Sequence, residues 1–122
     1  MLILTASLLA CHYLADYSHL TRPWMLKAKA TGSPILPIIS HAMVHVVLMA
    51  IVMFSLGVDG KLAQTALLLQ LVSHTIIDVV KGKLNVFPAI KNPTNQWHWI
   101  TFGGDQLLHQ LVILWMVSIV SV

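Results

Sequence analysis

The sequence predicts an all-α integral membrane protein, a four-helix bundle that occupies residues 1–122 as one domain. Apolar residues make up 57% of the chain and charged residues only 9%, whereas a soluble domain carries about 25% charged residues. So few charges cannot cover a surface that faces water. Within lipid, only helices and closed barrels satisfy every backbone amide internally. The apolar runs are long and do not alternate, which favours helices.

Each of the four apolar runs is bounded by polar or helix-breaking residues. Pro34 and Pro37 suit the first turn of the second helix, where a missing amide proton costs little. The tight turn expected at residues 57–60 (Gly-Val-Asp-Gly) separates the second helix from the third. Polar segments over residues 19–33 and 85–101 form the other connections. The helices are expected over about residues 2–20, 34–56, 61–84 and 102–121.

Basic residues in the connections predict how the chain is oriented in the membrane. The first connection holds Arg22, Lys27 and Lys29, and Lys91 in the third is preceded by two lysines at the end of the third helix. The second connection has only Lys61. The positive-inside rule therefore places the first and third connections in the cytoplasm and both termini outside. The basic residues behind the net charge of +3 thus determine the orientation of the chain in the membrane. We expect the partner to be the lipid bilayer and not nucleic acid.

One spacing recurs among the residues that commonly bind metals. Random placement of the 11 His and Asp residues would give about one pair at spacing four, but four occur, one in each apolar segment. On a helix this spacing brings two side chains to the same face. The pairs are His12–Asp16, His41–His45, His74–Asp78 and Asp105–His109.

The four pairs are also expected at a common depth in the membrane. They lie late in the first helix, early in the second, late in the third and early in the fourth. Because successive helices run in opposite directions, this alternation brings all four pairs within about two or three turns of the same membrane face. That face is the predicted cytoplasmic one. Ionisable residues inside a membrane are costly and usually mark function.

Five His and three Asp offer nitrogen and oxygen ligands, which suit Zn²⁺, Mn²⁺ or Fe²⁺. Eight donors exceed the four that one tetrahedral ion takes. Either two ions share them, or the Asp residues orient the imidazoles that bind one ion. Asp16, Asp78 and Asp105 are candidates to bridge metals or act as general base. Lys81, one turn nearer the cytoplasm than Asp78, is the best candidate to attract an anionic substrate.

The motifs resemble those of a bacterial membrane-protein family, domain of unknown function 3307. The resemblance covers nearly the whole chain. It rests on residues 12–17 (His-Tyr-Leu-Ala-Asp-Tyr), 24–27 (Trp-Met-Leu-Lys), 41–45, 74–81 and 105–109. It implies a bacterial inner-membrane location, the same fold and the same eight polar positions. It implies no reaction.

The resulting hypothesis is a metal-dependent hydrolase that acts on a phosphate-containing lipid or a small anionic substrate at the cytoplasmic leaflet. Three alternatives stay open for a site of this composition: a divalent-cation transporter, a haem-b protein, and a membrane protein with a purely structural metal. A hydrogen-bonded network of the eight side chains without metal is a further alternative. Four short helices bury little surface, which favours a homo-oligomer.

Overall fold

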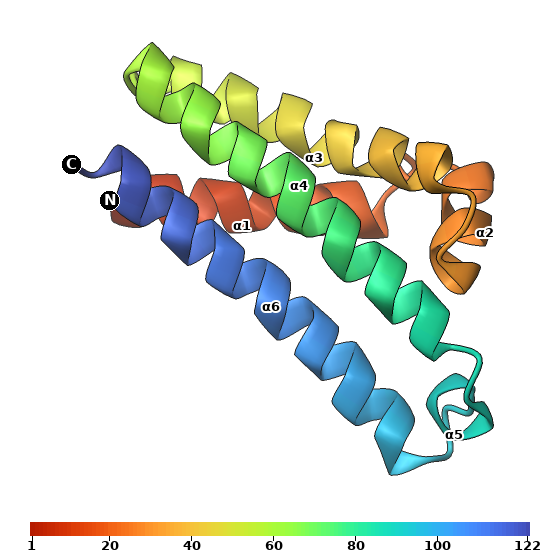
Figure 1. The fold of residues 1–122 in the computed structure, drawn as a ribbon. Helices are drawn as coiled ribbons and strands as arrows, with labels where there is room; N and C mark the ends of the chain where they lie inside the picture. Colours follow the sequence, from red (N-terminus) through yellow and green to blue (C-terminus); the bar gives the residue numbers. More distant parts are fainter.

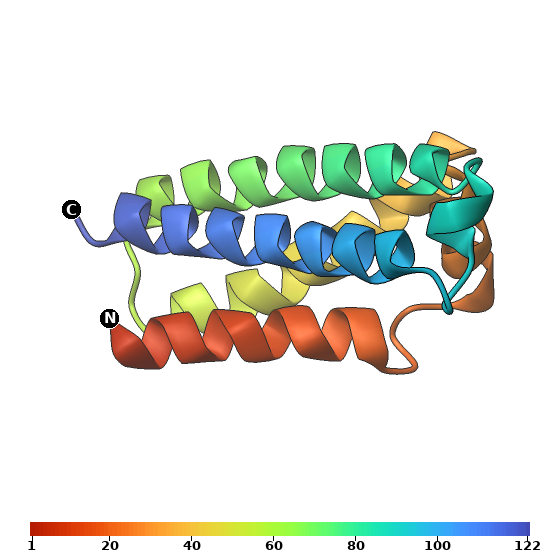
Figure 2. The ribbon, with the colours of Figure 1, turned by 90° about the horizontal axis from the view of Figure 1, so that it is seen from below.

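The computed structural model describes residues 1–122 and contains helices and turns but no strand (Figure 1). Four helices are long, and each of them contacts two of the others. The two shorter helices lie together at one end, and both termini lie at the opposite end (Figure 2). In chain order the helices are α1 (Leu2–Tyr17), α2 (Pro23–Thr31), α3 (Ile35–Ser55), α4 (Gly60–Leu84), α5 (Pro88–Lys91) and α6 (Gln96–Val120).

The prediction that the protein is all-helical is confirmed, but the structure has six helices where the sequence predicted four. The two additional helices lie in the expected polar connections. Pro23 starts α2 because its fixed φ suits a first helical position, and Gly32 ends α2 at a φ of 77°, which glycine tolerates best. The last helix begins at Gln96, six residues earlier than expected, because the Asn95 side chain caps the amide of Trp97.

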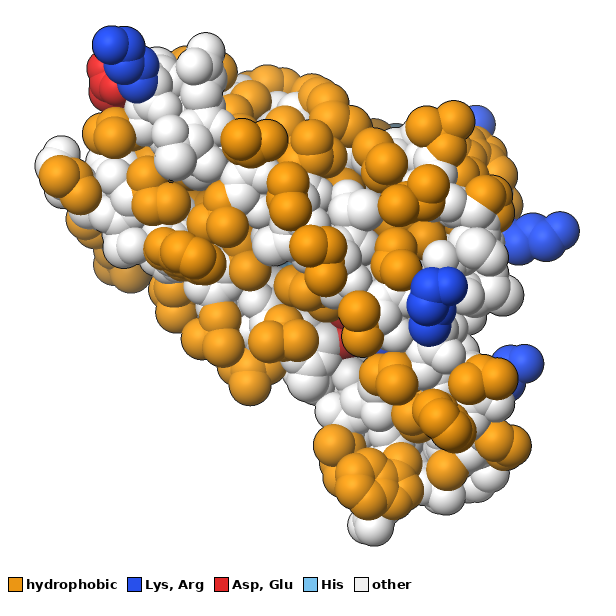
Figure 3. Space-filling model, in the orientation of Figure 1, with side chains coloured by type: hydrophobic (Ala, Val, Ile, Leu, Met, Phe, Trp, Pro, Cys, Tyr) orange, Lys and Arg blue, Asp and Glu red, His pale blue; other side chains and the backbone are white.

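Three helices, α3, α4 and α6, are long and apolar enough to cross a membrane. The expected first span is shorter than predicted, because α1 ends at Tyr17 and has only 16 residues, fewer than the roughly 20 that a bilayer requires. Figure 3 shows hydrophobic side chains over much of one face of the molecule, with most Lys and Arg side chains toward one end. On α4, an outward stripe of Leu68, Val72, Ile76 and Val80 is at least half exposed, as expected of a surface that faces lipid.

Each long helix has one stripe of inward-facing side chains that is polar at one end of the helix and apolar at the other. On α3, the stripe continues from His41 and His45 to the fully buried Met49 and Met53. The apolar parts of the four stripes form the hydrophobic core, which includes Leu4, Leu8, Ala63, Ala66, Ile113 and Met116. The polar ligand-type residues therefore lie at the α2 end of the molecule, and the apolar core fills the half toward the termini.

Two glycines let α2 lie against α4 at that end. A Cβ built on Gly82 would lie 2.3 Å from the Gly32 nitrogen and 2.5 Å from the carbonyl oxygen of Lys29. Both contacts are with backbone atoms, which cannot move unless α2 itself moves. The side-chain amide of Asn85 also donates to the carbonyl of Ala30, 2.9 Å away. These contacts fix the position of α2 relative to α4.

We expect Gly82→Ala to displace α2 and to destabilise the protein by about 1–3 kcal/mol, as overpacking typically does. The matched control is Gly104→Ala, because a Cβ at Gly104 meets no atom within 4 Å. Thermal unfolding in detergent would measure both variants. Equal stability of the two would contradict the close packing of α2 on α4.

Candidate metal centre

Eight side chains from α1, α3, α4 and α6 meet at the end of the molecule that α2 covers. They are the four predicted pairs, and each side chain has a nitrogen or oxygen atom within 3.4 Å of another member of the group. The five histidines are at most 5% exposed. The eight residues, called the centre below, are His12, Asp16, His41, His45, His74, Asp78, Asp105 and His109.

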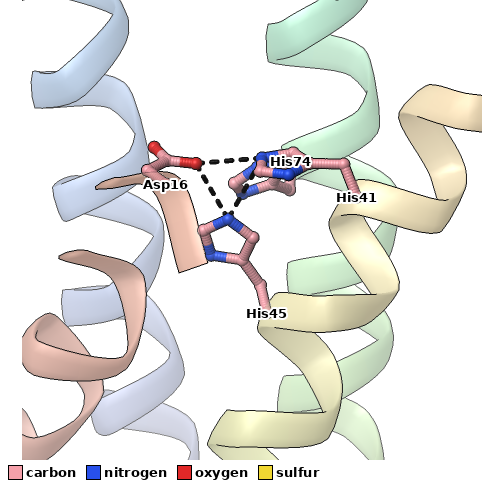
Figure 4. A group of neighbouring side chains, drawn as sticks. All are labelled: Asp16, His41, His45 and His74. Atoms are coloured by element: carbon pink, nitrogen blue, oxygen red, sulfur yellow. Dashed lines mark hydrogen bonds and ion pairs between the residues drawn. The ribbon is translucent and has the colours of Figure 1, made fainter. Parts of the chain in front are cut away.

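Within the centre, three ligand-type atoms form a small triangle between α1 and α3. The oxygen Oδ1 of Asp16 lies 2.9 Å from Nε2 of His41 and 3.0 Å from Nε2 of His45, and the two nitrogens are 3.3 Å apart. In Figure 4 the two imidazoles point from α3 toward Asp16. Ligands bound at about 2.0–2.1 Å to a tetrahedral zinc ion are roughly 3.3 Å apart. The triangle therefore has the size of one face of a tetrahedral metal site.

The buried hydroxyl of Thr21 determines which nitrogen of His41 faces this triangle. Thr21 donates its one hydroxyl proton to the carbonyl of Ala15, and its oxygen lies 3.3 Å from Nδ1 of His41. The Thr21 oxygen therefore accepts the proton on Nδ1. Nε2 of a neutral His41 then presents a lone pair to the Asp16 carboxylate, with no proton between them. Two acceptors in such close contact require a cation nearby. The ammonium of Lys29, 3.0 Å from Nε2 of His41, meets this requirement, and a bound metal would also meet it.

Replacing the Thr21 hydroxyl should weaken metal binding without removing a ligand. We expect Thr21→Val to lower metal affinity about 10–100-fold, the usual effect of losing a partner that orients a ligating histidine. Competition with a chromophoric chelator would measure the affinity. Thr65→Val is the matched control, because Thr65 is exposed and its hydroxyl bonds only within α4. Unchanged affinity in Thr21→Val would contradict the role assigned to Thr21.

The other side of the centre gathers around Asp78. Its Oδ2 lies 3.2 Å from Nε2 of His74, and its Oδ1 lies 3.4 Å from Nε2 of His109. Asp105 Oδ1 is also 3.4 Å from the same His109 nitrogen. One buried atom of each of these four residues lacks a hydrogen-bond partner. Buried polar atoms are rarely left unpaired, and a bound cation is one explanation.

His12 contacts one carboxylate on its own helix and a side chain on α6. Its Nε2 lies 3.3 Å from Oδ2 of Asp16 and 3.2 Å from Oε1 of Gln106. The His12 ring centroid is 5.0 Å from that of His45 and 5.1 Å from that of His109. His12 therefore lies between the Asp16 triangle and the Asp78 group, so the eight side chains form one continuous centre.

Lys29 of α2 extends its ammonium group into the centre. Its Nζ lies 3.0 Å from Nε2 of His41 and 3.5 Å from one oxygen each of Asp16 and Asp78. Burial by itself lowers the pKa of Lys29, but the nearby carboxylates of Asp78, Asp16 and Asp105 outweigh burial and raise the pKa above its usual value. Lys29 thus stays positively charged and is the one fixed cation among the three carboxylates.

A pocket of about 270 Å³ leads from the protein surface to the centre. The three carboxylates of the centre lie on its wall beside Lys29 and Lys81. Lys81, the candidate from the sequence, lines this pocket but forms no ion pair with the centre. The centre is therefore open at its carboxylate side, and two lysines flank the opening.

The structure brings all eight sequence-predicted residues together, but sequence reasoning missed four of their partners. The sequence places Lys29 in a connection, because nothing in the periodicity indicates that α2 folds back over the centre. Thr21 lies in a turn and gave no signal. Gln70 donates to Nδ1 of His74, 3.2 Å away, and it precedes His74 by four residues. Extending the spacing rule to glutamine would have found Gln70, and Gln106 is adjacent to a predicted ligand.

The family model described as "Protein of unknown function (DUF3307)" matches residues 3–122. The chain therefore belongs to this family, as its motifs predicted. No curated protein and no solved structure matches the chain.

Proposed function

We propose that the protein is a membrane-embedded, metal-dependent hydrolase whose substrate carries a phosphate group. The observation that carries this proposal is the group of Asp16, His41, His45 and His74, whose ligand atoms lie within 4.8 Å of one another. Asp16 also lines the pocket that opens to the surface, so an ion held there would be reached from the Asp16 side. Access of this kind distinguishes catalytic zinc sites from structural sites, which are closed. When bound, a divalent ion supplies a nucleophile at neutral pH and stabilises charge on phosphoryl oxygens.

The proposal includes a location. The four long helices would form a four-helix bundle within the cytoplasmic membrane, with both termini outside and the centre near the cytoplasmic face. The length and apolar composition of α3, α4 and α6 support insertion. The basic residues of the first and third connections and of the end of α4 support the orientation. They are Arg22, Lys27, Lys29, Lys81, Lys83 and Lys91. In this arrangement α1, which has only 16 residues, packs against its neighbours α3 and α6.

The charge of the centre favours one resident divalent ion. Three ionised carboxylates and the ammonium of Lys29 leave two negative charges if the imidazoles are neutral, and one divalent ion balances them. A second ion, held by Asp78, Asp105 and His109, would leave two positive charges, which a phosphate dianion could balance. We therefore propose one resident ion, Zn²⁺, Mn²⁺ or Fe²⁺, and a second that binds together with the substrate.

The side chains around the pocket suit hydrolysis of a phosphate ester. Lys29 and Lys81 would bind phosphoryl oxygens from the open side. The carboxylate oxygen of Asp78 that does not hold the second ion would accept the proton of the attacking water and return it to the leaving alcohol. Overall, water attacks phosphorus, the ester P–O bond breaks, and an alcohol and inorganic phosphate leave. Asp16 stays a ligand throughout.

Two features of the structure argue against the alternatives. A transporter needs polar groups along a path to the other face, but beyond Gln70 the interior is filled by the apolar core with Met49, Met53 and Met116. A haem needs space for a porphyrin between two histidines, but the five histidine rings pack against one another, with centroids as close as 3.9 Å. Neither function gains support from the contacts within the centre.

The test is hydrolysis of phosphate esters by the purified, metal-loaded protein in detergent. We expect release of inorganic phosphate that a chelator abolishes and added metal restores. The matched control is Asp59→Asn, because Asp59 caps α4 at the far end of the molecule, whereas Asp78→Asn should lose turnover. Equal phosphate release by these two variants would overturn the proposal.

A further inference from the structure

A second pocket joins the centre from the side, between α1 and α6. It has a volume of about 630 Å³ and is lined on one side by α1 and on the other by α6. Tyr17 and Gln106 line both this pocket and the pocket that leads to the carboxylates. The two pockets therefore adjoin at these two residues, and His12 forms part of the floor of the lateral pocket.

The lateral pocket changes from polar to apolar along its length. Its α1 wall runs from Tyr17 to Leu9 and its α6 wall from Gln106 to Leu114. Each wall covers nine residues, and the eight rises between the first and the last correspond to about 12 Å of helix. Because the two helices are antiparallel, the polar ends lie together at the centre and the two leucines lie together at the far end. Tyr13 and Gln110 line the pocket between these two ends.

We propose, on the basis of the proposed function, that the substrate is a lipid phosphate. Its phosphate would lie beside Lys29 and Lys81, and its acyl chain would lie in the lateral pocket between α1 and α6. A small water-soluble substrate would have no use for a side pocket of this length that ends in two leucines, whereas an amphiphile needs a polar and an apolar compartment that meet. Four side chains of the pocket, those of Leu9, Tyr13, Tyr17 and Leu114, are more than one-third exposed, so a chain could enter from the lipid phase.

The test uses a lipid phosphonate, which cannot be hydrolysed, with a photoreactive diazirine in its acyl chain. The metal-loaded protein is irradiated with this probe, and adducts are located by mass spectrometry. We expect adducts on Leu9, Tyr13 or Leu114. The control probe carries an alcohol headgroup in place of the phosphonate and forms no ion pair with either lysine, so it should give at least tenfold fewer adducts. Adducts spread evenly over the outer faces of α3 and α4 would overturn the proposal, as would equal labelling by the alcohol probe.

Filling the pocket provides the second test. Leu9→Trp should reduce adducts at Tyr13 and Leu114 at least tenfold and should lower the ratio of lipid-phosphate to soluble-ester turnover. The matched control is Leu111→Trp, because Leu111 is half exposed on α6 and does not line the lateral pocket. If both variants behave alike, the pocket does not hold the chain.

The two proposals fail in different ways in these experiments. Specific labelling of the pocket without any phosphate release would support lipid binding in the pocket and contradict the proposed hydrolase activity. Release of phosphate from a soluble ester without labelling of the pocket would support the hydrolase and overturn the lipid substrate. In that case the phosphate source is a water-soluble molecule.

Discussion

The double substitution His41→Ala with His45→Ala is expected to abolish tight metal binding. It removes two of the three atoms of the triangle, which lie 2.9 and 3.0 Å from the Asp16 oxygen. Losing a residue that only orients a ligand typically costs 10–100-fold in affinity, so losing two ligands should cost well over 100-fold. Titration with a competing chelator measures the affinity, and phosphate release should fall to background with it.

The matched control for this prediction is His19→Ala with His98→Ala. His19 is exposed. His98 lies on α6, and its Nδ1 is 2.7 Å from the carbonyl oxygen of Ile90 in α5. Both double variants replace two histidines by alanine, so they differ only in which histidines are lost. Circular dichroism and size-exclusion chromatography would establish that each remains folded. Retained metal affinity in His41→Ala with His45→Ala would show that the triangle does not bind the ion.

Substitution of Lys29 by Met is expected to separate metal binding from phosphate binding. The variant keeps all eight residues of the centre, so the metal should remain bound. It loses a charge-assisted contact to phosphate, worth about 1.5–3 kcal/mol, and binding of inorganic phosphate should weaken about 10–100-fold. Isothermal titration of the metal-loaded protein with phosphate measures this loss. The matched control is Lys27→Met, which removes an exposed lysine from the same helix.

The same variant should also change stability in a metal-dependent way. Without metal, Lys29 is the only fixed cation beside Asp16, Asp78 and Asp105, and its side chain is 21% exposed. Its removal should destabilise the metal-free protein by about 2–4 kcal/mol, because buried carboxylates lose their partner. The bound ion replaces that charge, so the metal-loaded variant should be affected less. Equal destabilisation of both forms would contradict a cation site next to Lys29.

The convergence of the eight ligand-type residues could be predicted from sequence because it depends on two simple periodicities. The i, i+4 spacing places both members of a pair, such as His74 and Asp78, on one helix face. The alternation of late and early positions then brings four faces to one depth. Both periodicities can be read from the order of residues along the chain alone.

The parts that the sequence did not predict depend on contacts distant along the chain. Lys29 reaches the centre only because Gly32 and Gly82 let α2 pack against α4, and an isolated lysine in a polar segment carries no sign of this. The hydrogen bond from His41 to Thr21 likewise depends on how the chain turns after α1. The lateral pocket is formed by Tyr13 and Leu114 on helices at opposite ends of the sequence, and neither shows a periodicity that marks it.

The most direct test of a metal centre at Asp16, His41 and His45 is elemental analysis of the purified wild-type protein after removal of loosely bound ions. We predict one divalent ion per chain in the wild-type protein and essentially none when His41 and His45 are both replaced by alanine. A folded wild-type protein that binds no ion would contradict the account, because the eight side chains would then form only a hydrogen-bonded network. The same stoichiometry in wild-type protein and double variant would contradict it equally.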